Sequence, residues 1–213
     1  MKKLVLAIVA LGVSVGAFAQ GQPMGFGIKA GVNFPKYNFS GDNAAYQTNS
    51  STNFHVTAFL DAPIATDWFS IQPGVSLQGK GAELIDNEFG SFTQNTMWLE
   101  VPVNFVAKFP VQNAGNFFLG AGPYVAFGLS GKNKYDSDWG STETEFEFDK
   151  EGTLKGTDFG LNFIGGFQFA NGLMVHGGYG MGITDLRGSN NNYFTGDEKL
   201  TNRVWTVGLG FAL

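Results

Sequence analysis

Eight segments of this chain alternate apolar and polar residues, and the gaps between them alternate between long and short. The segments are 24–34, 52–63, 67–80, 94–110, 115–130, 155–169, 172–185 and 201–213. Four gaps are long and polar, namely 35–51, 81–93, 131–154 and 186–200, and three are tight, namely 64–66, 111–114 and 170–171. A transmembrane β-barrel has this rhythm, because short turns join its strands at one rim and long loops at the other.

The two faces of each segment differ in polarity, as residues 97–109 illustrate. One face of this segment is wholly apolar, and the opposite face carries Glu100, Asn104 and Lys108 among Trp98, Pro102 and Val106. Successive side chains of a strand point to opposite faces, so this is the period of a β-strand. The polar faces of the other segments are mostly Gly, Ser, Asn and Gln.

The low charge of the chain indicates which face meets water. Charged residues make up 15% of the sequence, against about 25% in ordinary soluble domains. The polar faces carry few of them, whereas the surface of a soluble domain carries about 25–35%. We therefore expect the apolar faces to lie against lipid and the polar faces to line a narrow lumen. The sequence predicts an all-β fold, an eight-stranded antiparallel up-and-down transmembrane β-barrel with four long extracellular loops.

The N-terminus is typical of a secretory signal peptide. Lys2 and Lys3 precede an apolar stretch that ends in Ala17-Phe18-Ala19, a small-x-small cleavage site. We expect residues 1–19 to be a signal peptide and residues 20–213 the barrel domain. The chain has no cysteine, which excludes disulfides and thiol chemistry, and its net charge of −5 argues against a nucleic-acid partner.

Three prolines, Pro73, Pro102 and Pro123, fall inside predicted strands, where each removes a ladder hydrogen bond. Glycines stand beside two of them, Gly74 beside Pro73 and Gly122 beside Pro123. We expect β-bulges at these two positions.

Several stretches resemble a known family. They are GIKAGVNF (27–34), FSIQPGVSLQGKGAE (69–83), LEVPVNFVAKF (99–109), FLGAGPYVAFGLSGK (118–132), DFGLNFIGGFQF (158–169) and NRVWTVGLGFAL (202–213). With them the chain resembles the PorT-like outer-membrane proteins, eight-stranded barrels of the OmpX and OmpA kind. The resemblance implies a location in the outer membrane of a Gram-negative bacterium. The namesake of the family serves a protein secretion system, so an accessory role in secretion is one alternative function.

Five charged residues fall on the predicted lumen face: Lys29, Asp61, Glu100, Lys108 and Asp158. An isolated charge in a narrow lumen is costly, so we expect them to pair across it, with Lys29 and Glu100 as one candidate pair. Such pairs would form a static plug, or alternatively the gate of a narrow pore.

The two histidines, His55 and His176, also fall on the predicted lumen face. Counted along tilted strands, their heights differ by about 10 Å, so we expect them not to share a metal. Polar filling of the lumen is the favoured interpretation. The alternative, a lipid hydrolase or acyltransferase that uses His55 near the outer rim, has no supporting motif.

The most acidic segment is the gap 131–154. Glu143, Glu145, Glu147 and Asp149 alternate with apolar or hydroxyl side chains, as in a strand above the membrane. Four acids on one face could bind Ca²⁺, although a solvated acidic edge is the favoured interpretation. The last long gap carries Tyr193 and Phe194, a candidate contact for a partner or lipopolysaccharide.

Together these features predict a non-enzymatic protein with no cofactor. Its role would be structural, or a surface interaction through the extracellular loops; a narrow pore is the main alternative. The expected partners are outer-membrane lipid, lipopolysaccharide and an extracellular or envelope protein. We expect a monomer.

Overall fold

The computed structural model describes residues 24–40, 48–64, 66–87, 90–137, 139–150, 154–188 and 199–213. These ranges contain nine β-strands: β1 (Gly25–Ser40), β2 (Asn53–Ile64), β3 (Thr66–Asn87), β4 (Gly90–Val111), β5 (Gly115–Ser137), β6 (Gly140–Phe146), β7 (Thr157–Phe169), β8 (Leu173–Gly182) and β9 (Lys199–Ala212). Within the same ranges, no helix has the length and apolar character needed to span a membrane.

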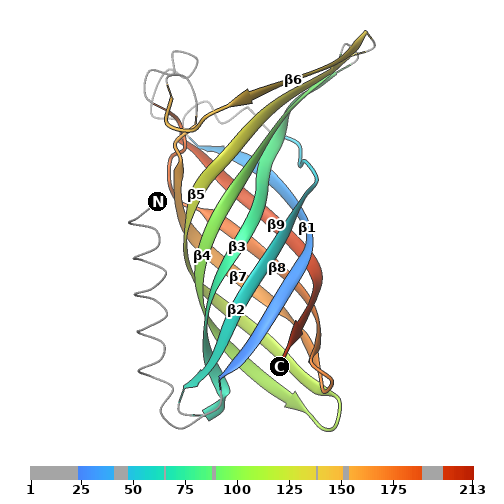
Figure 1. The fold of residues 1–213 in the computed structure, drawn as a ribbon, viewed down its shortest axis with the longest axis vertical. Helices are drawn as coiled ribbons and strands as arrows, with labels where there is room; N and C mark the ends of the chain where they lie inside the picture. The colour runs from blue at the N-terminus through green and yellow to red at the C-terminus, as the bar shows by residue number, and fades with distance from the viewer. Residues whose placement is uncertain are drawn as a thin grey trace.

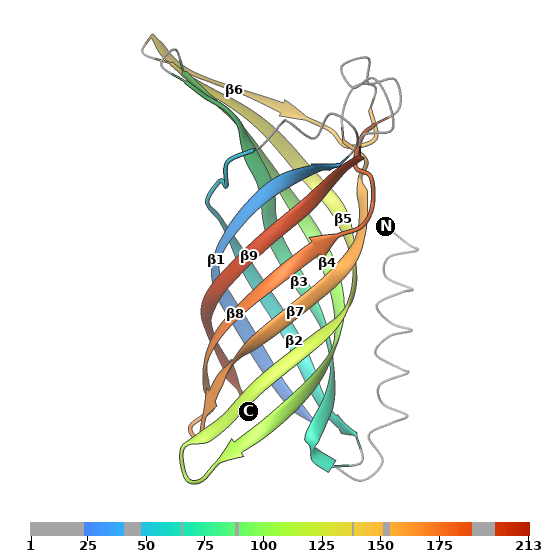
Figure 2. The same ribbon diagram turned by 180° about the vertical axis from the view of Figure 1, so that it is seen from behind.

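Eight of the strands close into a ring, which Figures 1 and 2 show from opposite sides. Neighbours along the chain pair antiparallel, β1 pairs with β9, and β5 pairs with both β4 and β7. Within the described ranges, the ninth strand, β6, pairs only with the far end of β5, and it is not part of the ring. The predicted eight-stranded up-and-down barrel is confirmed.

Tight turns gather at one end of the barrel, which we call the turn end. They join β2 to β3, β4 to β5 and β7 to β8, and they lie at the bottom of Figure 1. Asn113 and Gly172 in these turns have positive φ angles of 58° and 88°, a backbone conformation that suits glycine and asparagine. The opposite end, at the top of Figure 1, is called the loop end.

At the loop end several predicted gaps are strand. The prediction of a loop over 81–93 is wrong, because β3 and β4 continue through it and remain paired to Asn87 and Gly90. Likewise β1 runs to Ser40 and β5 to Ser137. Pairing of backbone groups does not require an apolar face, so the strands extend past the point where the apolar alternation stops.

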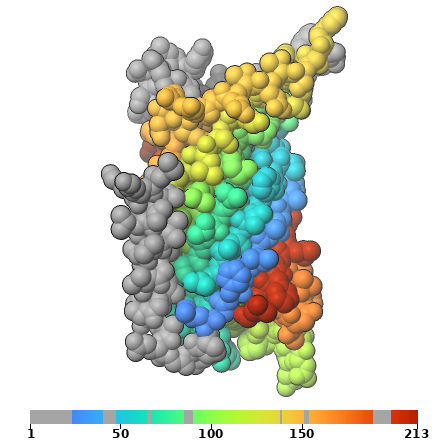
Figure 3. All heavy atoms as spheres, viewed as in Figure 1, coloured from blue at the N-terminus to red at the C-terminus, as the bar shows by residue number. Residues whose placement is uncertain are grey.

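The strand predicted within 131–154 is present as β6. It forms a hairpin with β5, in which Asn133 pairs with Thr144 and Lys134 with Glu143. The loop-end parts of β3, β4, β5 and β6 thus make one sheet, which we call the projecting sheet. The hairpin of β5 and β6 stands out beyond the barrel in Figures 1 and 3.

The apolar faces of the strands point outward, as predicted. Large side chains on the outer face are about half exposed, and Leu119 reaches 62%. On the inner face, Trp98, Asn33 and Asp158 are buried. This arrangement suits a barrel surrounded by lipid, because a soluble barrel would bury the apolar face.

The bulges expected at Pro73 and Pro123 are absent. Pairing keeps a single register across Pro73, from Pro73 with Val103 to Ser76 with Glu100, and Pro123 pairs in register with Leu161. The register shifts fall elsewhere, at Pro63/Ile64, Glu83/Ile85 and Met97/Trp98. A proline lacks one donor but needs no extra residue opposite it, so it costs a bond without shifting the register.

Two apolar clusters fill the lumen toward its ends. The loop-end cluster consists of Tyr37, Ala82, Trp98, Tyr124, Ala126, Leu154, Leu186 and Leu200. The turn-end cluster consists of Phe59, Val106, Phe118, Met174 and Ala212. Polar residues that include Lys80, Glu100, His55 and His176 line the lumen between them.

Candidate functional site

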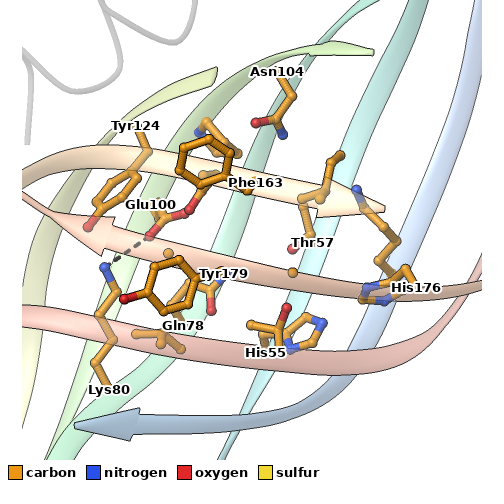
Figure 4. Close-up of a pocket in the computed structure, with 18 residues that line it drawn as sticks. His55, Thr57, Gln78, Lys80, Glu100, Asn104, Tyr124, Phe163, His176 and Tyr179 are labelled. Atoms are coloured by element: carbon orange, nitrogen blue, oxygen red, sulfur yellow. Dashed lines mark hydrogen bonds and ion pairs between the residues drawn. The ribbon is translucent and has the colours of Figure 1, made fainter. Parts of the chain in front are cut away.

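An ion cluster centred on Lys80 lies inside the barrel. Lys80 Nζ is 3.0 Å from Glu100 Oε2 and 3.4 Å from Asp158 Oδ2, and all three residues are buried. Asn162 Nδ2 donates to Glu100 Oε1 over 2.8 Å, and Tyr124 Oη donates to Asp158 Oδ2 over 3.1 Å. This Lys80 cluster joins β3, β4, β5 and β7 across the lumen, and Figure 4 shows the pair of Lys80 and Glu100.

The cluster differs from the predicted pairing. Glu100 and Asp158 are in the lumen, as predicted. The predicted pair of Lys29 with Glu100 is not formed, because Glu100 pairs with Lys80 instead. Sequence reasoning did not include Lys80 among the lumen charges. Its signal was present, since Lys80 continues the polar face of Ser76 and Gln78 along the same strand.

The remaining predicted lumen charges lie nearer the turn end. Lys108 forms an ion pair with Asp61, and Gln72 Nε2 donates to Asp61 Oδ1 over 3.2 Å. Lys29 Nζ instead lies over the ring of Phe59, 4.5 Å from its centroid.

The two histidines meet inside the barrel, so the predicted separation in height is wrong. The ring centroids of His55 and His176 are 5.3 Å apart. His55 pairs with Gly31, Gly31 with Gly208, and Gly208 with His176. Neighbouring strands in a barrel are tilted and staggered relative to each other. The number of residues from each turn therefore does not give the relative heights of His55 and His176 along the barrel axis. The two glycines between the histidines leave room for the rings to approach.

The surroundings of His55 do not resemble a hydrolase site. His55 Nδ1 is 2.7 Å from Asn33 Oδ1, an acceptor, so Nδ1 carries the proton. The ring is buried in the lumen rather than placed at the rim. Across the described part of the chain, no three His, Cys, Asp or Glu side chains are grouped to hold a metal ion.

A small cavity separates the Lys80 cluster from the histidines. Its volume is about 60 Å³, enough for a few water molecules at about 10–15 Å³ each. Lys80 and Glu100 lie at one end of the pocket in Figure 4, and His55 and His176 at the other. The space is local, because the two apolar clusters lie beyond it.

The acidic residues of the projecting sheet do not share one strand face. Glu143 and Glu145 lie on β6, and Lys132 Nζ is 3.3 Å from Glu145 Oε1. The strand ends at Phe146, before Glu147 and Asp149. Lys150 pairs with Glu147 over 3.4 Å, and Asp149 Oδ1 accepts from Gly156 N over 2.9 Å.

Phe148 lies just beyond the end of the strand. Its ring packs on Trp98 with the centroids 4.8 Å apart, which directs the chain back toward the loop-end cluster. The predicted four-acid face is therefore wrong. Tyr193 and Phe194 lie outside the described residues.

A closed antiparallel barrel with an apolar exterior and a polar, filled lumen defines an outer-membrane β-barrel protein. A family model described as outer membrane protein beta-barrel domain matches residues 18–188, and the chain belongs to this family. Membership places it in the outer membrane.

Several solved structures are similar to this chain. The attachment invasion locus protein Ail of Yersinia pestis is 12% identical with a TM-score of 0.45, over 90% of this chain and 100% of that one. Neisserial surface protein A is 13% identical with a TM-score of 0.44, over 89% and 99%. OprG of Pseudomonas aeruginosa is 13% identical with a TM-score of 0.44, over 89% and 95%. The likeness concerns the fold alone. No curated protein sequence matches the chain.

Proposed function

We propose that this protein is a non-enzymatic barrel that acts at the cell surface, where its projecting sheet contacts an extracellular or envelope protein. The observation that carries the proposal is the strand β6. In the described part of the sheet it pairs on one side only, with β5. An unpaired edge presents a row of backbone donors and acceptors to which an extended segment of a partner can add.

The side chains of the hairpin suit contact with a partner. Trp139 at its tip is 98% exposed and Tyr135 is 45% exposed. Aromatic side chains at exposed tips supply large contact areas at low conformational cost. Glu143 and Glu145 beside them favour a partner segment that carries basic residues.

We also propose a narrower family placement. The stretches quoted above support a place among the PorT-like proteins, with residues 1–19 as a cleaved signal peptide, 20–213 as the barrel and the loop end outside the cell. Outer-membrane lipid and lipopolysaccharide would surround a monomeric barrel. An accessory role in protein secretion is the alternative that this family placement suggests.

A deletion strain tests the surface role. We expect wild-type protein to restore envelope integrity and surface attachment, and the variant Trp139→Ala/Glu143→Lys/Glu145→Lys to fail at equal expression and equal heat-modifiable mobility. The matched control is Lys199→Ala, an exposed change at the loop end outside the projecting sheet, which should restore both. Full rescue by the triple variant would exclude this surface.

A further inference from the structure

Within the residues that the structure describes, the lumen contains a buried lysine, Lys29, that forms no ion pair. Among the described residues, Glu100 and Asp158 both bind Lys80, and Asp61 binds Lys108. Lys29, which is 7% exposed, has no carboxylate within ion-pair distance, and its ammonium group lies over the ring of Phe59. A buried charge of this kind is costly unless an opposite charge accompanies it.

His176 contributes a second unsatisfied group to the same cavity. The residue is 8% exposed, and its Nε2 is buried without a hydrogen-bond partner. His176 and Lys29 both line the cavity of about 60 Å³. An acceptor beside Nε2 would favour the tautomer that carries the ring proton on this nitrogen.

The strand β9 brings these two groups together. It lies between β1, which carries Lys29, and β8, which carries His176, and its inward positions there are Gly210 and Gly208. A Cβ at Gly208 would lie 2.8 Å from His176 Nε2, and a Cβ at Gly210 would lie 2.8 Å from Lys29 Cγ. Both side chains therefore lean over β9 where a larger residue would exclude them.

We infer that this cavity is a binding site for a small monovalent anion, with chloride or bromide as the probe. The anion accepts hydrogen bonds from the Lys29 ammonium and His176 Nε2–H, and waters fill the remaining space. A single charge matches the single unpaired cation, because Lys80 and Glu100 on the far side of the cavity already pair with each other. The small volume excludes larger organic anions.

Crystals of the whole protein grown with sodium bromide in place of chloride test the site. We expect an anomalous peak beside Lys29 and His176 in the wild type. The peak should be lost in Lys29→Met and kept in Lys36→Met, an exposed lysine on the same strand. Persistence of the peak in Lys29→Met would overturn the proposal, as would a wild-type cavity that holds only water in saturating bromide.

A solution measurement keeps the proposal testable if Lys29→Met does not fold. The unfolding midpoint of the wild type should rise with bromide concentration relative to gluconate at equal ionic strength, as for any ligand that binds only the folded state. His176→Phe should raise the bromide concentration that gives half of this shift at least tenfold. An equal dependence in the wild type and His176→Phe would contradict the role of His176.

Discussion

At the scale of single residues, Lys80 shows how the lumen accommodates charge. One ammonium group serves two carboxylates, and Asn162, Tyr124 and Asn202 supply further donors to them. Breaking a buried ion pair by removing one partner leaves an uncompensated charge, whereas replacing all partners together can be neutral. Loss of Lys80 should therefore destabilise the fold only when the carboxylates of Glu100 and Asp158 are still present.

Replacing Lys80 with Met should destabilise the barrel by about 3–5 kcal/mol, because Glu100 and Asp158 would be left buried and unpaired. Urea unfolding in lipid vesicles measures the change. The triple variant Lys80→Met/Glu100→Gln/Asp158→Asn should recover most of the loss. If the single and triple variants are equally unstable, the ion cluster does not carry this energy.

A valine at Gly208 should destabilise the barrel by about 1–3 kcal/mol through overpacking. The new Cβ would press on His176 Nε2 and on the Ala30 backbone. The matched control is Gly177→Ala on the adjacent strand, where a Cβ meets only the Thr206 carbonyl oxygen at 3.5 Å. Heat-modifiable mobility and the unfolding midpoint compare the two variants, and equal loss in both would contradict the packing argument.

Asp185 at the loop end should make local structure sensitive to acid. Partial burial opposes its ionisation, but the Leu200 and Arg187 amides and the Arg187 guanidinium outweigh burial and hold the pKa of Asp185 below its ordinary value. The ionised carboxylate therefore stabilises the fold above the ordinary pKa of about 3.9, and this contribution is lost as the pH falls through the lower folded value.

The amide shift of Leu200 reports this transition. It should titrate below pH 3.9 in the wild type and stay flat in Asp185→Asn, which keeps an acceptor but does not ionise. A midpoint at or above the ordinary value would show that the donors do not stabilise the carboxylate.

At the scale of elements, the period-2 alternation predicted every strand that crosses the membrane layer. It failed where strands leave that layer, as in 81–87 and 90–93, because no lipid face imposes alternation there. The alternation also could not predict that Pro73 and Pro123 pair without a β-bulge. A bulge depends on the number of residues in the partner strand opposite the proline, and the local sequence does not give that number.

Shortening the hairpin of β5 and β6 should leave the barrel intact. We would replace residues 134–143 by Asn-Gly, which closes a two-residue turn between the paired Asn133 and Thr144. We expect unchanged heat-modifiable mobility, because β6 lies outside the closed ring and the deleted end of β5 pairs in the ring only with Ser91, Phe92 and Thr93 of β4. Loss of the folded band would mean that the projecting sheet is needed to close the barrel.

At the scale of the whole molecule, the filled lumen argues against the pore alternative. The loop-end and turn-end clusters lie on either side of the polar cavity. We expect no single-channel current from the wild type or from Glu100→Ala in planar bilayers. Steps in the Glu100→Ala record alone would instead identify the Lys80 cluster as a gate.

The candidate site was predictable as a set of residues but not as a set of contacts. The alternation of polar and apolar residues along each strand correctly placed Glu100, Asp158 and both histidines on the inner face of the barrel. Partner choice depends on register around the ring, which brings His55 beside His176 through Gly31 and Gly208. No single segment of the sequence carries that information.

Because β1 pairs with β9, the barrel cannot close until β9 is in place. The second neighbour of β1 is β9, which pairs with it from Gly27 with Ala212 to Ser40 with Lys199. Until those residues are available, two strand edges would face lipid with unsatisfied backbone groups. A chain cut short before β9 would therefore leave the facing edges of β1 and β8 unpaired, and its barrel could not close.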